Sequence, residues 1–135
     1  MVRVVFACVQ NAGRSQMAAA FFNQLADAAK ARAVSAGTRP AAAVHDAVVT
    51  VMREAGVDLS SAAPRHLSAA LAEPADWLIT MGCGEECPVV PGAARDDWPV
   101  PDPAHEPMER VRDIRDAIRR KVGEFVTRHG YNPSP

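Results

Sequence analysis

The stretch VRVVFACVQNAGRSQM, from Val2 to Met17, joins a buried-strand pattern to a loop of small residues and a helix start. Its first residues are mostly β-branched or aromatic, which is typical of a short strand buried on both faces, as in a parallel sheet. The run ends at Cys8, and five residues separate Cys8 from Arg14. Because an apolar stripe at helical spacing begins at Ser15, the stretch predicts a strand, a tight loop and a helix.

The alternation of strands and helices continues along the rest of the chain. Apolar runs predict further strands at 32–37 and 76–82. Within a proline-rich stretch, 93–98 is a candidate for a short strand before a loop. Apolar stripes predict helices at 15–29, 48–55 and 109–128. This order implies an α/β fold with a doubly wound, about four-stranded parallel sheet and helices on both faces. Ligands of such sheets bind at the carboxyl ends of the strands, which is where Cys8 lies.

Length and composition limit the class of protein. The chain has 135 residues, 48% of them hydrophobic, which suits one domain, expected at 1–130 with a loose tail at 131–135. Fifteen basic and sixteen acidic residues without a single-sign block argue against nucleic acid or a membrane as partner. Since no apolar run approaches the roughly 20 residues that span a bilayer, we expect a cytoplasmic protein. We also expect it to be a monomer. Three cysteines cannot all pair, so thiol chemistry is expected.

The loop between Cys8 and Arg14 has the composition of an anion-binding cradle. Small residues let backbone N–H groups turn inward, and the helix start adds unpaired donors and the positive end of its dipole. Arginine supplies a planar fork of donors that matches a tetrahedral oxyanion, and the same field favours a thiolate at Cys8. The expected oxyanion ligands are Val9, Gln10, Asn11, Ala12, Gly13, Arg14 and Ser15. The alternative is a buried structural cysteine beside a capping arginine.

A family resemblance is carried by four segments: VVFACVQNAGRSQMAAAFF, VSAGT, DWLITMGCGEECP and DDWPVPDPA. They resemble the low-molecular-weight protein tyrosine phosphatase fold and, within it, the thiol-dependent arsenate reductases. The resemblance implies that Cys8 attacks arsenate and that further thiols supply the two electrons that release arsenite. In the implied relay, Cys83 forms a disulfide with Cys8, Cys87 then attacks Cys83, and the final Cys83–Cys87 disulfide is reduced from outside.

The same resemblance implies an acid, a reductant and competing ligands. Asp102, in PDPA, matches the family's aspartate-proline and is the expected general acid, with Asp96 and Asp97 as alternatives. The reductant is thioredoxin, or a low-molecular-weight thiol with a glutaredoxin-like protein, and phosphate and sulfate compete with arsenate. No tightly bound cofactor or metal is expected. Alanines in MAAAFF replace the acidic residue with which some arsenate reductases bind potassium, and two cysteines alone make a poor zinc site.

Two other functions fit the same residues. A low-molecular-weight phosphatase would hydrolyse phosphoesters through Cys8 and would need no further thiol. Against it, Ala104 and His105 follow the aspartate-proline where phosphatases of this fold have tyrosines, and the loop has RSQM in place of RSP. The second alternative is an oxyanion-binding or regulatory module that keeps the fold without turnover.

Overall fold

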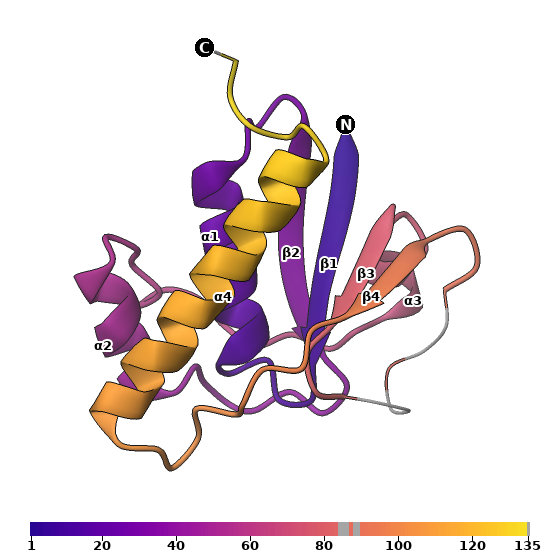
Figure 1. Ribbon diagram of the computed structural model, residues 1–135. Coiled ribbons are helices and arrows are strands. Elements are labelled where there is room, and N and C mark those ends of the chain that lie inside the picture. Colours follow the sequence, from indigo (N-terminus) through magenta and orange to yellow (C-terminus); the bar gives the residue numbers. More distant parts are fainter. Residues whose placement is uncertain (84–86, 88–89, 135) are drawn as a thin grey trace.

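The sheet is four-stranded and entirely parallel, as the sequence predicts. The computed structural model describes residues 1–83, 87 and 90–134. Its strands are β1 (Val2–Cys8), β2 (Ala31–Gly37), β3 (Trp77–Thr80) and β4 (Ala94–Asp97). They pair in the order β2-β1-β3-β4. Strand β1 is therefore an inner strand, and its carboxyl end lies between β2 and β3 (Figure 1).

The helices cover the sheet unequally. They are α1 (Arg14–Leu25), α2 (Asp46–Glu54), α3 (Ala69–Ala72) and α4 (Met108–Arg128). Figure 1 shows α1, α2 and α4 on one side of the sheet and the short α3 on the other. Because side chains alternate along a strand, Phe6 and Cys8 of β1 belong to the larger core under α1 and α4. Ala7 belongs to a smaller core with Ala72 of α3.

The first helix is shorter than the predicted span of 15–29. It ends at Leu25, and Ala29 is exposed in a turn outside it. The Asp27 carboxylate accepts a hydrogen bond from the Ala29 N–H at 2.9 Å, and the Asp27 carbonyl accepts from the Ala31 N–H at 3.0 Å. An aspartate that bonds its own backbone two residues on competes with the helix, which explains the early end without a glycine or proline.

The residues after α4 are held against the molecule. The Tyr131 ring lies 6.2 Å from the Phe125 ring, and the Tyr131 carbonyl accepts a hydrogen bond from the Asp27 N–H at 2.8 Å. Lys30 Nζ donates to the Asn132 carbonyl at 2.6 Å. The composition of 131–135 predicts a loose tail, whereas Tyr131 and Asn132 are held by these contacts. The reason is that the aromatic ring of Tyr131 is stabilised by packing, which the polar residues around it do not indicate.

The outer edge of β2 is occupied by a side chain from α1. Asn23 Oδ1 accepts a hydrogen bond from the Ala33 N–H at 2.8 Å, and Asn23 Nδ2 donates to the Ala33 carbonyl at 2.9 Å. Arg32 Nη1 donates to the Asn23 carbonyl at 3.2 Å. One amide thus satisfies both backbone groups of a residue on an edge strand.

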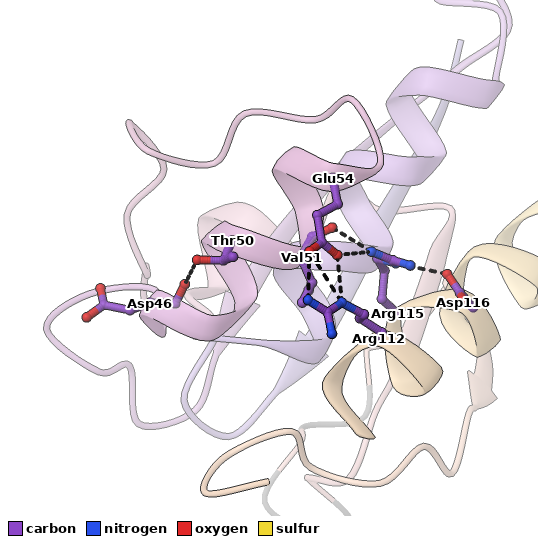
Figure 2. A network of polar contacts seen from close by, with 7 residues as sticks. All are labelled: Asp46, Thr50, Val51, Glu54, Arg112, Arg115 and Asp116. Carbon is purple, nitrogen blue, oxygen red and sulfur yellow. Dashed lines mark hydrogen bonds and ion pairs between the residues drawn. The ribbon is translucent and has the colours of Figure 1, made fainter. Parts of the chain in front are cut away.

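Ion pairs fasten α2 to α4, as Figure 2 shows. The Glu54 carboxylate accepts hydrogen bonds from Arg112 Nη2 at 2.9 Å and from Arg115 Nη1 at 2.9 Å. Arg115 Nη1 also donates to the Val51 carbonyl at 2.9 Å, and Arg115 Nε donates to Asp116 at 2.8 Å. The hydrogen bond from Arg112, together with the charges of both arginines, lowers the pKa of Glu54 from its ordinary value of 4.5.

This lowered pKa gives a pH-dependent prediction. A carboxyl group whose pKa is lower in the folded state stabilises the fold above its unfolded pKa, and the contribution disappears as the pH falls through the folded value. We expect Glu54→Gln to lower Tm by about 2–4 °C at pH 7. The deficit should shrink as the pH falls below the ordinary value of 4.5. Thermal unfolding followed by circular dichroism between pH 7 and pH 3 measures this, with exposed Glu73→Gln as control. A deficit that is constant with pH would contradict the assignment.

Candidate active site

The loop after β1 directs hydrogen-bond donors at the sulfur of Cys8. The Asn11 N–H donates to Cys8 Sγ at 3.2 Å, and Ser15 Oγ lies 2.8 Å from the same sulfur. Asn11 Nδ2 donates to Ser15 Oγ at 2.7 Å, which leaves the serine's own proton free to point at the sulfur. Two donors on one buried sulfur stabilise negative charge there, so the arrangement suits a nucleophilic thiolate.

Asn11 also holds the shape of the loop. Its φ of 51° lies in the left-handed region, which asparagine tolerates better than most residues. Asn11 Oδ1 accepts from the Arg65 N–H at 3.0 Å, and Gln16 Nε2 donates to the Asn11 carbonyl at 3.1 Å. Gln16 Nε2 also lies within 3.3 Å of the Ala63 carbonyl. Sequence reasoning missed Gln16 as a support of the loop, although it directly follows the predicted cradle.

Arg14 joins the loop to the segment that carries the predicted acid. Its side chain is 14% exposed, Nη1 donates to the Val100 carbonyl at 3.0 Å, and Nη2 lies 3.7 Å from Asp102 Oδ2. A Cβ atom at Gly13 would lie 3.0 Å from Pro103 Cγ, so a glycine there lets the two segments close on each other. The structure therefore brings the Asp102 carboxylate next to the guanidinium.

A small cavity of about 30 Å³ lies between these groups. It is lined by Cys8, Val9, Gln10, Ala12, Gly13, Arg14, His45 and Asp102. The predicted nucleophile, arginine and acid thus share one space. His45 also lines the cavity. Its backbone N–H donates to the Ala12 carbonyl at 3.0 Å, which ties the start of α2 to the loop.

The two alternative acids lie elsewhere. The Asp96 carboxylate accepts a hydrogen bond from Trp98 Nε1 at 3.0 Å, and Asp97 lies 3.7 Å from Arg95. Both aspartates line a separate hollow beside α4, which also includes Lys121. Of these three aspartates, Asp102 is the one that lines the same cavity as Cys8.

The two remaining cysteines form a disulfide on the other side of β1. Cys83 and Cys87 are joined, with 5.6 Å between their Cα atoms, and both are buried in the smaller core. Cys83 Sγ lies 3.8 Å from the Ala7 carbonyl, whereas the free Cys8 belongs to the larger core. The structure thus brings Cys83 to Cys87 and not to Cys8. Residues 84–86, between the pair, lie outside the described residues.

The polar groups around the cavity suit an anion. They comprise an arginine, a histidine and a glutamine against one carboxylate, and the Asn11 N–H points at the Cys8 sulfur. Within the described ranges, no three His, Cys, Asp or Glu side chains gather closely enough to hold a metal ion. None of the described helices combines the length and apolar character needed to cross a membrane.

Comparison with known sequences gives matches along almost the whole chain. The family model described as low molecular weight phosphotyrosine protein phosphatase matches residues 3–131. A putative arsenate reductase from Halobacterium salinarum is 42% identical over 135 residues, covering 95% of this chain and 92% of that protein. A glutaredoxin arsenate reductase from Synechocystis sp. is 30% identical over 131 residues, covering 95% and 98%.

Solved structures show the same similarity. The thioredoxin-dependent arsenate reductase of Corynebacterium glutamicum superposes with a TM-score of 0.81 at 34% identity, and the match covers 95% of this chain but 61% of that one. An arsenate reductase in its oxidized state superposes with a TM-score of 0.84 at 29% identity, covering 95% and 98%.

Proposed function

The chain belongs to the low molecular weight phosphotyrosine protein phosphatase family, and we propose that it is an arsenate reductase that works through a thiol relay. The observation that carries this proposal is the Cys83–Cys87 disulfide, which lies behind β1 from the oxyanion cradle. A phosphatase resolves its cysteinyl-phosphate with water and needs no further thiol. A reductase needs two electrons for each arsenate, and a dithiol that becomes a disulfide supplies two.

The first step takes place in the cavity between the loop and Asp102. Loop N–H groups and Arg14 bind arsenate, and the Cys8 thiolate attacks arsenic to form a sulfur–arsenic bond. One arsenate oxygen departs as water after it receives a proton from Asp102. The 3.7 Å separation between Arg14 Nη2 and the Asp102 carboxylate supports these roles, because two groups this close can both contact one oxyanion.

The second step transfers the electrons. The Cys83 thiolate attacks the Cys8 sulfur, a Cys8–Cys83 disulfide forms, and the electron pair of the broken sulfur–arsenic bond reduces arsenic(V) to arsenic(III), which leaves as arsenite. The Cys87 thiolate then attacks Cys83 and frees Cys8 as a thiolate. The described disulfide corresponds to the end of this cycle, and an external dithiol restores the two thiols.

The relay requires movement of Cys83. In the disulfide form its sulfur lies behind β1 near the Ala7 carbonyl, while Cys8 faces the other core. The reduced segment must therefore bring Cys83 around the carboxyl end of β1 before it can attack. Similarity to relatives named as thioredoxin-dependent or glutaredoxin enzymes supports a protein thiol as the external donor.

Steady-state assays with two separate donor systems test the function. Thioredoxin with its reductase and NADPH should support arsenate-dependent NADPH oxidation and arsenite release, and glutathione with glutaredoxin is the comparison. Hydrolysis of p-nitrophenyl phosphate without arsenate-dependent thiol consumption would establish the phosphatase instead. Tight phosphate binding without either activity would establish a binding module.

Arg14→Lys tests the cradle independently of the relay. Lysine keeps the charge but loses the planar fork, so we expect kcat/KM for arsenate to fall about 10²–10³-fold and phosphate to inhibit more weakly. Arg110→Lys, at an exposed position of α4, is the control and should leave both constants unchanged. Near-normal kinetics of the Arg14 variant would exclude bidentate binding of the oxyanion by this residue.

A further inference from the structure

Gly82 lies directly against the guanidinium group of Arg14. A Cβ atom placed on Gly82 would overlap Arg14 Nη1 and would lie 3.0 Å from Cζ and 3.2 Å from Nη2. The φ angle of Gly82 is 91°, a left-handed conformation that L side chains rarely adopt. Gly56, Gly92 and Gly130 also have positive φ, but a Cβ atom on any of them would meet nothing within 4 Å. Among these four glycines, the contact with a functional side chain is particular to Gly82.

Three groups together fix the orientation of the Arg14 side chain. Gly82 contacts the guanidinium, the Val100 carbonyl accepts from Nη1 at 3.0 Å, and the Asp102 carboxylate lies 3.7 Å from Nη2. The side chain is 14% exposed, so it has little room to move away from an added group. A bidentate donor works only when both N–H vectors meet the ligand's oxygens, and a misplacement of about 1 Å costs roughly 10²-fold in a positioned site.

We propose that Gly82 is a positioning residue of the oxyanion site, which takes no side chain so that Arg14 can lie against its backbone. The proposal deepens the proposed function and rests on its oxyanion site. Gly82 also directly precedes Cys83. The backbone that contacts the arginine is therefore the start of the segment that carries the redox pair. Gly82 thus connects the oxyanion site to the Cys83–Cys87 pair.

Two matched alanine variants separate this role from backbone strain. Gly82→Ala and Gly92→Ala place the same side chain at φ angles of 91° and 87°, but only the first meets Arg14. With inorganic phosphate as the probe in isothermal titration calorimetry, we expect Gly82→Ala to raise Kd about 10–100-fold. Gly92→Ala should bind phosphate as the wild type does. KM for arsenate should rise in parallel in Gly82→Ala alone.

A double-mutant cycle with Arg14 gives a readout that a general structural defect would not produce. In an Arg14→Lys background, adding Gly82→Ala should change the phosphate Kd by less than about twofold, because the group it displaces is already gone. If Gly82→Ala loses its cooperative thermal transition while Gly92→Ala keeps it, adding Arg14→Ala must restore the transition. Failure to restore it would overturn the inference.

The outcomes distinguish this inference from the proposed function. Equal phosphate Kd values in Gly82→Ala and Gly92→Ala, or a full additive loss in the Arg14→Lys background, would overturn the positioning role while arsenate reduction by the wild type stands. A wild-type protein that neither binds phosphate nor consumes thiols with arsenate would overturn the proposed function, and this inference with it.

Discussion

Cys8→Ser should reduce arsenite production by at least about 10⁴-fold, the scale of loss when an enzyme loses its nucleophile. The Asn11 N–H and the Ser15 hydroxyl stabilise negative charge on a sulfur at 3.2 and 2.8 Å, but they cannot ionise a serine hydroxyl at neutral pH. A serine oxygen also cannot enter a disulfide, so Cys83 has no sulfur to attack and arsenic(V) is not reduced. Arsenite formation with the thioredoxin system, followed by chromatography with arsenic detection, measures the loss.

Phosphate binding is the control for this variant. Serine is close to cysteine in size, and the loop N–H groups and Arg14 remain, so the phosphate Kd should stay within about threefold of the wild-type value. Loss of binding together with turnover would mean that the loop had collapsed, and the kinetic result would then not identify the nucleophile. Turnover above about 1% of wild type in a variant that binds phosphate would eliminate Cys8 as the nucleophile.

Cys83→Ser and Cys87→Ser should both stop turnover with thioredoxin, but at different points. Cys83→Ser has no thiol that resolves the Cys8 adduct, so it should bind arsenate and release no arsenite. Cys87→Ser should complete about one turnover and stop as a Cys8–Cys83 disulfide. Mass spectrometry of the digested protein should show these two peptides joined, with two hydrogen atoms fewer than in the separate thiols.

The pair of variants also separates the relay from simpler chemistry. Wild-type rates of both variants with thioredoxin would disprove the relay. Activity of both variants only with a small thiol would indicate a single-cysteine mechanism, in which the small thiol resolves the Cys8 adduct directly. Both cysteines of the Cys83–Cys87 disulfide are buried. We therefore expect that a reductant reaches their sulfurs only after the segment that carries them opens.

Sequence periodicity predicts the long elements of the fold well. The helix expected at 109–128 begins one residue earlier, at Met108, and it buries the six apolar residues that the spacing selects: Val111, Ile114, Ile118, Val122, Phe125 and Val126. The early end of α1 escapes this reasoning because it results from a local turn at Asp27. Helix α3 also escapes it, since four residues are too few to show a period.

The candidate site divides in the same way. Cys8, Asn11, Arg14 and Ser15 belong to one short stretch, so their spacing alone indicates a cradle. Asp102 enters through a family resemblance, and the structure places it beside the arginine. The roles of His45 and Gly82 arise only when distant segments close on the loop, and no local pattern records such contacts. The position of Cys83 behind β1 likewise depends on the path of a loop.

The hydrogen bonds of Asn23 to β2 affect how molecules of this protein can associate through their sheet edges. An edge strand with unpaired backbone groups is a template onto which a strand of another molecule can add, which is a common route to aggregation. At Ala33 both backbone groups are already bonded to the Asn23 amide, at 2.8 and 2.9 Å. An incoming strand must break these two hydrogen bonds before it can pair with Ala33, so an asparagine on a helix hinders growth of the sheet at this position of β2.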